Sequence, residues 1–171
     1  MRKIKPFVPP TAAEFTDTDR RMMALAIEEA RLAAESGDVP VGAVIARGDT
    51  VIAKARNLRE VEKNATAHAE VLCIDEACRI LGGWRLPGCT LYVTLEPCPM
   101  CAGAVINSRI ERVVYGLKDA KSGSFGSVVN LAAYPYNHKP KIESGLMEKE
   151  AAEMLSEFFA ERRSSAAAHK E

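Results

Sequence analysis

The sequence predicts one α/β domain of three layers, with helices on both faces of a mixed sheet of about five strands. The first observation is the order of the periodic segments: helix, hairpin, helix, strand, helix, strand, loop, strand, helix. The second is that helices connect successive strands, since such crossovers join parallel strands of one sheet. The third is size, because 171 residues with 47% hydrophobic side chains suffice for a single buried core.

The domain is expected over residues 16–165, between an arm and a tail. Residues 1–15 contain three prolines and show neither helical nor strand periodicity, which predicts an extended, mobile arm. The Ser/Ala-rich C-terminal end, residues 166–171, is expected to fray. No internal repeat or linker divides the chain between these ends, so a single domain is predicted.

Four helices are expected where apolar residues recur three and four positions apart. Thr16 or Thr18 can cap the first helix, which runs to about Ser36, and Gly37 ends it. Gly82 and Gly83 end the second helix. The expected ranges of the other three helices are about 66–81, 98–108 and 148–163.

Five strands are expected between these helices. The first two form a hairpin whose turn is Gly48-Asp49. Residues 118–140 are rich in glycine and proline, which predicts a loop with one helical turn near residues 128–131. The expected strand ranges are about 39–46, 50–55, 89–95, 112–117 and 141–144.

Charge and hydropathy exclude several classes of protein. The 23 basic residues balance the 23 acidic ones, which argues against a surface that binds polyanions throughout but leaves room for a local basic patch. No apolar run is long enough to span a bilayer, and prolines interrupt the start of the chain where a signal peptide would be apolar. A cytoplasmic location is therefore expected, and there the cysteines outside the metal motif are read as reduced, small, buried side chains.

One imidazole, two thiols and a carboxylate carry the chemistry of the sequence. His68, Cys98 and Cys101 offer three ligands of the types that zinc prefers, and Glu70 lies two residues after the histidine. Three protein ligands leave the fourth position open to water, as catalysis requires. The pattern H-x-E followed by P-C-x-x-C is the signature of zinc-dependent nucleobase deaminases.

The spacing of these residues predicts where the metal lies. Residues two apart on a helix point about 200° apart, so His68 and Glu70 can converge only just beyond a helix N-terminus. Cys98 and Cys101 are three apart and are neighbours on the first turn of their own helix. Zinc is therefore expected between two helix N-termini, whose positive ends favour thiolates.

Two other interpretations of the cysteine pair remain. A redox pair would leave His68 and Glu70 without a role. A structural zinc site would need a fourth ligand. Cys73, Cys78 or Cys89 could supply that ligand, although none is spaced to pair with the histidine.

The chain resembles the zinc-dependent cytidine/deoxycytidylate deaminase superfamily, and within it the bacterial tRNA-specific adenosine deaminases. This resemblance covers about residues 18–163 and implies the cytidine-deaminase-like version of the predicted fold. It also implies one zinc ion per subunit, a homodimer joined near the third helix, and conversion of adenosine to inosine at the wobble position of the anticodon stem-loop of tRNA. The stretches that carry it are 38–44, 66–70, 91–103, 108–116, 119–123 and 156–163.

The resemblance assigns roles to individual residues. Glu70 corresponds to the carboxylate that moves protons in the reaction, while Asn57 and the backbone N–H of Ala69 correspond to groups that contact the base. Asp119 and Lys121 lie in a loop that is near the substrate backbone in the family. Four further candidates for RNA contact are basic or aromatic: Phe158, Phe159, Arg162 and Arg163.

Two alternative functions stay open at the level of sequence. A deaminase of free bases or nucleotides, such as guanine deaminase, can share the Pro-Cys-Pro-Met-Cys segment; a non-catalytic zinc module that binds RNA is the other. The chain also departs from the family where Ala65 replaces an expected proline and Arg56 an expected aromatic residue. Neither residue is a metal ligand, so these departures bear on fine substrate preference and not on the chemistry.

Overall fold

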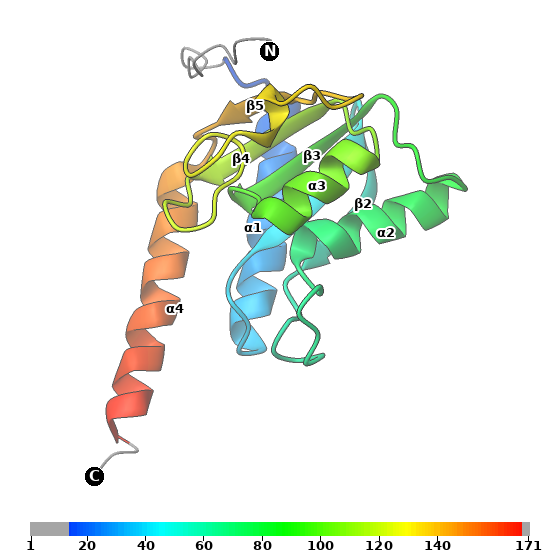
Figure 1. Cartoon of the computed structure of the whole chain (residues 1–171). Helices are drawn as coiled ribbons and strands as arrows, with labels where there is room; N and C mark the ends of the chain where they lie inside the picture. Colours follow the sequence, from blue (N-terminus) through cyan, green and yellow to red (C-terminus); the bar gives the residue numbers. More distant parts are fainter. Residues whose placement is uncertain (1–13, 169–171) are drawn as a thin grey trace.

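The computed structural model describes residues 14–168, so most of the predicted arm and the last three residues of the predicted tail lie outside the described range. Figure 1 shows the predicted sheet with helices around it. The helices are α1 (Asp17–Glu35), α2 (Ala69–Leu81), α3 (Pro99–Asn107), the short 3₁₀ helix η1 (Leu131–Ala133) and α4 (Glu148–Ala168). The strands are β1 (Gly42–Arg47), β2 (Thr50–Arg56), β3 (Cys89–Leu95), β4 (Arg112–Leu117) and β5 (Lys141–Ser144).

The sheet is mixed and five-stranded, as predicted, with the order β2-β1-β3-β4-β5. β1 pairs antiparallel with β2 and β3, whereas β3, β4 and β5 run parallel to one another. The carboxyl ends of β3 and β4 therefore lie at the same edge of the sheet as the amino end of β1. At this edge, Gly42 at the start of β1 donates its N–H to Thr94 Oγ1 on β3 at 3.2 Å.

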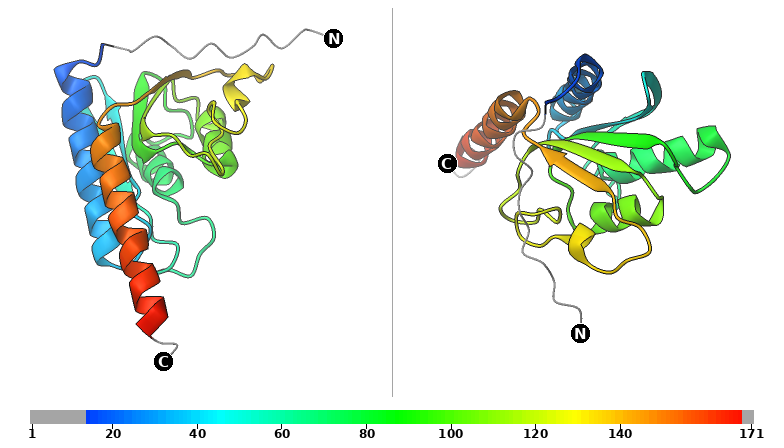
Figure 2. Two further views of the ribbon diagram at one scale, coloured as in Figure 1. Left: turned by 90° about the vertical axis from the view of Figure 1, so that its left-hand side faces the viewer. Right: turned by 90° about the horizontal axis from the view of Figure 1, so that it is seen from above.

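Helices cover both faces of the sheet, so the three-layer prediction is confirmed. α1 and α4 pack on one face and α2 and α3 on the other (Figure 2). Two apolar cores separate the layers: one lies between the sheet and the pair α2 and α3, and the other lies beneath α1. Within residues 14–168, no helix combines the length and the apolarity needed to cross a membrane.

One helix and one strand, α2 and β1, begin later than the sequence predicts. α2 starts at Ala69 and not at Thr66, because the Asn64 side chain accepts hydrogen bonds from the N–H and the hydroxyl of Thr66 and holds a turn there. β1 starts at Gly42 and not at Val39, since Pro40 has no N–H to give to a sheet.

Two further differences lie in the C-terminal third. The predicted turn near residues 128–131 is displaced to η1, whose N-terminus is capped by Asn130. α4 continues to Ala168 instead of ending near Arg163, because alanine has the strongest intrinsic preference for helix.

A buried ion cluster joins α1 to the parallel half of the sheet. Asp19, at 2% exposure, accepts hydrogen bonds from Arg112 on β4 at 2.6 Å and from the Tyr92 hydroxyl on β3 at 2.8 Å. Arg112 also donates to Glu143 on β5. Burial raises the pKa of Asp19, but the Arg112 guanidinium and the hydrogen bonds from Thr16 and Tyr92 outweigh it and hold that pKa well below its usual range.

This cluster gives a pH-dependent contribution to stability. Because the pKa of Asp19 is lowered on folding, its contribution is complete above the unfolded value of about 3.9 and is lost as the pH falls further. Asp19→Asn is expected to lower the free energy of unfolding by about 2 kcal/mol at neutral pH. The difference from wild type should shrink below about pH 4 in urea melts. The exposed Asp17→Asn, in the same helical turn, is the control and should leave that free energy almost unchanged.

Candidate active site

The three predicted metal ligands come from the starts of two helices at one edge of the sheet. His68 is the N-cap of α2 and Cys98 the N-cap of α3, both with extended backbones. Cys101 lies in the first turn of α3, and Pro99 fixes the start of that helix. Neither cap makes a side-chain hydrogen bond to its own helix, so both side chains are free to point between the two helices.

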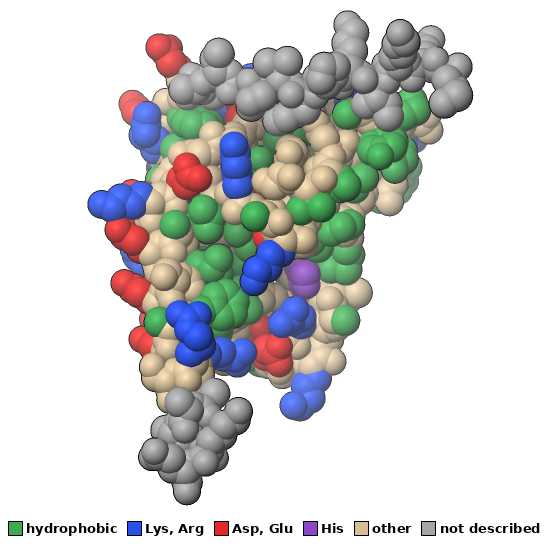
Figure 3. Space-filling model, turned by 60° about the vertical axis from the view of Figure 1, so that its left-hand side comes forward, with side chains coloured by type: hydrophobic (Ala, Val, Ile, Leu, Met, Phe, Trp, Pro, Cys, Tyr) green, Lys and Arg blue, Asp and Glu red, His purple; other side chains and the backbone are tan. Residues whose placement is uncertain are grey.

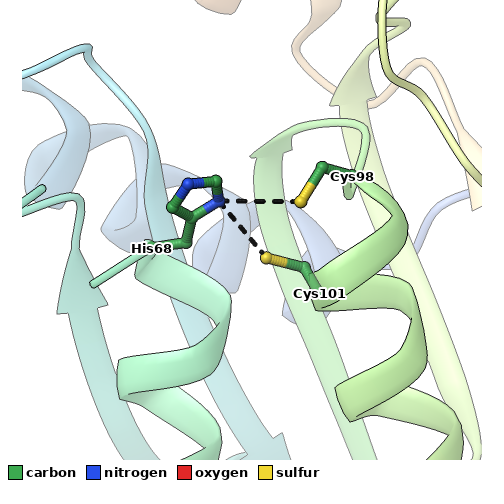
Figure 4. Close-up of side chains that lie close together, drawn as sticks. All are labelled: His68, Cys98 and Cys101. Atoms are coloured by element: carbon green, nitrogen blue, oxygen red, sulfur yellow. Dashed lines mark hydrogen bonds between the residues drawn. The ribbon is translucent and has the colours of Figure 1, made fainter. Parts of the chain in front are cut away.

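The three donor atoms have the separations that a shared tetrahedral ion requires. His68 Nδ1 lies 3.7 Å from Cys98 Sγ and 3.5 Å from Cys101 Sγ (Figure 4). Bond lengths of about 2.0 Å to nitrogen and about 2.3 Å to sulfur put such ligands about 3.6 Å apart on a tetrahedral zinc ion. All three donor atoms lie within 4.8 Å of one another, and the residues present therefore fit a metal ion.

Two of the three other cysteines, Cys73 and Cys78, make hydrogen bonds away from the ligand group. Cys73 is buried and its thiol donates to backbone carbonyls of β1 and β2. Cys78 lies near the C-terminus of α2, beside the carbonyl of Trp84. Within residues 14–168, the ligand group consists of His68, Cys98 and Cys101 alone. This arrangement removes the proposed source of a fourth cysteine ligand for a closed structural site.

The thiols and the imidazole perturb one another strongly. A hydrogen bond from Cys101, helped by His68, lowers the pKa of Cys98 to about 4, despite the opposing effect of burial. The same contact with Cys98, together with burial, raises the pKa of Cys101. The hydrogen bond to Cys98 raises the pKa of His68. One sulfur is thus already a thiolate at neutral pH, as metal binding requires.

Glu70 is buried beside the ligand group. It lies in the first turn of α2 and is 4% exposed. Burial is the main cause that raises the pKa of Glu70 to about 7, and the negative charge of Cys98 adds to it. A carboxyl group with a pKa near neutrality can both accept and donate a proton at physiological pH.

A cavity of about 110 Å³ opens beside these residues. Its wall includes Asn57, Ala69 and Asp119 from the predicted set, together with His68 and Glu70. Asn57 is 6% exposed and follows β2, where its Nδ2 donates to the Val39 carbonyl at 3.3 Å. The structure thus brings the predicted base contacts and two of the predicted metal ligands, His68 and Cys98, to one cavity.

The remaining predicted substrate contacts lie outside this cavity. Lys121 and Phe159 line a separate groove between the loop after β4 and α4, where Arg163 joins them. Arg162 donates to the Gly37 carbonyl at 3.0 Å, and its guanidinium lies 5.1 Å from the centre of the Phe158 ring. Phe158 is 7% exposed and belongs to the core, whereas Phe159 is 40% exposed.

The cavity also contains residues that sequence reasoning did not single out as site residues. Arg59 brings a positive charge, and Val39 and Val41 form an apolar wall. Glu96 lies at the end of β3 and is 2% exposed. In the sequence, Glu96 lies two positions before the candidate metal ligand Cys98, and this position could have identified it as a site residue. Its burial supports such a role, because carboxylates are rarely buried without a specific partner.

The mixed sheet and a His/Cys/Cys group able to hold a metal ion, beside a buried glutamate, fit a deaminase. The model of the MafB19-like deaminase family matches residues 17–163. The tRNA-specific adenosine deaminase of Bacillus subtilis is 54% identical over 146 residues, which cover 85% of this chain and 91% of that protein. The counterpart from Aquifex aeolicus is 49% identical, over 82% of this chain and 93% of that protein.

A solved structure agrees with these sequence relatives. It comes from structural studies of A-to-I editing by tRNA:A34 deaminases at the wobble position, and it superposes with a TM-score of 0.77 at 47% identity over 79% of this chain and 99% of that one. Guanine deaminase from Bacillus subtilis matches less well, with a TM-score of 0.55 and 57% of this chain covered. The chain belongs to the tRNA-specific adenosine deaminase family.

The geometry of the ligand group predicts the effect of removing one donor. His68→Ala and Cys101→Ser should each lower the metal content of purified protein from about one ion per chain to well below half, because two ligands hold the ion far less tightly than three. Elemental analysis measures the content. Cys78→Ser, which alters a cysteine outside the group, should keep the full amount. Full metal content in both ligand variants would contradict the assignment.

Proposed function

We propose that this protein is a zinc-dependent enzyme that deaminates adenosine to inosine in tRNA, at the wobble position of the anticodon. One observation carries the proposal: three donor atoms with the spacing of a tetrahedral metal site lie beside a buried carboxyl group, in a chain 54% identical to a tRNA-specific adenosine deaminase. In this proposal the domain over residues 16–165 holds the whole activity.

His68, Cys98 and Cys101 would hold the zinc ion, since one nitrogen and two sulfurs are ligand types that zinc prefers. Such an ion supplies one thing: it lowers the pKa of a water molecule in the site towards neutrality and so makes a nucleophile available. The partial positive charges at the N-termini of α2 and α3 stabilise the negative charge of the thiolates in this group.

Glu70 would carry protons between water and substrate. It is the buried carboxylic acid at the N-terminus of α2 that faces the cavity, and burial brings its pKa to about 7. It can therefore take a proton from the attacking water and give protons to the ring nitrogen and to the departing amine. The amine leaves as ammonia, and the carbon that carried it keeps the oxygen of water.

Asn57 and Ala69 would hold the base. The Asn57 amide uses one N–H on the Val39 carbonyl, and its oxygen accepts from the N–H of Arg59 at 3.4 Å. One further N–H and one lone pair of that amide remain for the edge of a purine. The backbone N–H of Ala69 is among the first N–H groups of α2, which have no partner inside the helix. Together they offer donors and an acceptor to one flat base.

The small cavity favours a base that has left its stack. A volume of about 110 Å³ between α2, β3 and the loop after β4 admits one base and excludes a duplex. Bases in a single-stranded loop are splayed out most easily, which fits an anticodon loop as substrate. Valine side chains on one wall suit the apolar faces of the ring.

Acidic and basic side chains lie on different sides of α4, and the basic side could contact a nucleic acid. The side of α4 that faces α1 lines a groove with Glu150, Glu153, Glu157 and Glu161. The side that faces the loop after β4 carries Phe159 and Arg163, next to Lys121. In Figure 3, many acidic side chains lie along the left edge of the molecule, where some basic ones also occur, and several basic side chains lie lower on this face around the histidine. The RNA backbone would follow the basic side, where an exposed aromatic ring can stack a base.

The enzyme would act as a homodimer in the cytoplasm. Exposed apolar side chains occur on α3 and on the segment that adjoins it, and such surfaces mark contacts between proteins. They are Met100, Val128, Val129, Tyr134 and Tyr136. The cytoplasm contains both the substrate RNA and the reducing conditions that keep all five cysteines free.

Removal of the proton carrier should separate metal binding from turnover. Glu70→Gln keeps the shape of the side chain but cannot take a proton, so the turnover rate should fall by about 10²-fold or more. The metal content should equal that of wild type, because Glu70 is not one of the three ligands. Turnover within a few-fold of wild type would exclude Glu70 as the proton carrier.

The substrate is tested with purified, zinc-loaded protein and four candidates: an anticodon stem-loop with adenosine at the wobble position, the same stem-loop with guanosine there, free adenosine, and guanine. Inosine should form in the first RNA alone, and neither xanthine nor ammonia should appear with guanine. The KM for the RNA should rise about tenfold between 50 and 200 mM salt, the change expected when about two phosphates are bound. Guanine as the preferred substrate would establish the alternative of a free-base deaminase.

A further inference from the structure

Glu96 is a buried carboxylate that the proposed reaction does not use. It follows the last residue of β3 and precedes Cys98 by two positions. Its exposure is 2%, and its hydrogen-bond partners among the described residues are backbone N–H groups and one hydroxyl. A buried carboxylate without a cationic partner is costly, so its contacts call for an explanation.

Among the described residues, the hydrogen bonds of the Glu96 side chain all go to one irregular segment, residues 118–127, which we name the β4 loop. Oε2 accepts from the N–H of Asp119 at 3.1 Å and from the hydroxyl of Ser127. Oε1 accepts from the N–H of Phe125 at 3.0 Å and from that of Ser127 at 3.1 Å. One side chain thus holds both ends of the loop, with four donors on two oxygens.

The middle of the β4 loop is shaped around the same carboxylate. A Cβ atom on Gly123 would lie 2.4 Å from Glu96 Cδ, so only glycine fits there. The N–H of Ser124 donates to the Pro97 carbonyl at 2.9 Å. The loop therefore wraps around Glu96 and Pro97, directly before the metal ligand Cys98.

This anchoring fixes the part of the loop that meets the cavity. Asp119 and Ser122 line the cavity together with Glu96, Cys98 and Glu70. Within the loop, Asp119 accepts from the N–H of Lys121 at 2.8 Å and from the hydroxyl of Ser122. The position of Asp119, and with it that of Lys121, depends on the hydrogen bond to Glu96.

We propose that Glu96 is a positioning residue that fixes the β4 loop against the metal-binding end of α3 and so sets the substrate contacts of Asp119, Lys121 and Ser122. It acts through the loop, since its side-chain hydrogen bonds go to Asp119, Phe125 and Ser127 and not to His68, Cys98 or Cys101. The part of this inference that concerns substrate rests on the proposed function, whereas the part that concerns the loop does not.

The test replaces Glu96 by glutamine, which keeps the shape but turns one acceptor oxygen into an NH₂ group facing two donors. Amide hydrogen exchange in peptides covering residues 118–128 should become about tenfold faster or more, the equivalent of losing one charge-assisted hydrogen bond. The KM for the anticodon stem-loop should rise about tenfold, with kcat within about threefold of wild type, because binding is lost and the chemical step is kept. The zinc content should not change.

Two variants serve as controls. Glu111→Gln alters an exposed carboxylate that accepts one backbone N–H, from Gly88, and should change neither the exchange of the β4 loop nor the KM. Ser127→Ala removes one of the four donors and should give a smaller effect than Glu96→Gln in both measurements.

Three outcomes would overturn the inference: unchanged exchange in the β4 loop, loss of zinc from Glu96→Gln, or a fall in kcat with KM unchanged. Failure of the proposed function looks different, because wild-type protein would then leave the stem-loop unmodified. The exchange of the β4 loop would still respond to Glu96→Gln in that case, and a response there would support the anchoring.

Discussion

The structure depends on the meeting of two helix N-termini at one edge of the sheet. β3 ends there and leads through Glu96 and Pro97 into α3, while α2 begins opposite with His68 as its cap. Neither His68 nor Cys98 makes a side-chain hydrogen bond to its own helix, and the donor atoms of His68, Cys98 and Cys101 converge within 4.8 Å. The N-termini of both helices carry partial positive charge, which stabilises a thiolate between them. The thiolate is the form of cysteine that binds a metal cation.

Buried carboxylates organise the loops around this point. Glu96 fixes the loop after β4 through backbone N–H groups, and Asp38 does the same for the segment after β2 by accepting from the N–H groups of Glu60 and Val61. Both are almost fully buried. A carboxylate accepts several hydrogen bonds at fixed angles, so it can hold irregular backbone that no sheet or helix supports. These contacts hold the irregular segments that supply Arg59, Asp119 and Ser122 to the wall of the cavity.

The cavity and the neighbouring groove between the loop after β4 and α4 differ in how firmly their side chains are held. The base contacts proposed for Asn57 and Ala69 lie on segments locked by backbone hydrogen bonds. The proposed RNA contacts, Lys121, Phe159 and Arg163, are placed on a loop and on an exposed helix face, where they can follow a flexible strand. The division fits a reaction in which one base is read closely and its neighbours are held mainly by charge and stacking.

The sequence by itself predicted the order of elements, the mixed sheet and the three candidate metal ligands, because apolar periodicity and the residue types of a ligand motif can be read along the chain. β3, β4 and β5 match their predicted limits, whereas α2 starts three residues late because Asn64 holds a turn before it. Only the tertiary structure decided which distant residues share the cavity. The contact between Glu96 and Asp119 spans 23 positions of chain, and it forms because β3 and β4 are parallel neighbours whose ends reach the same edge.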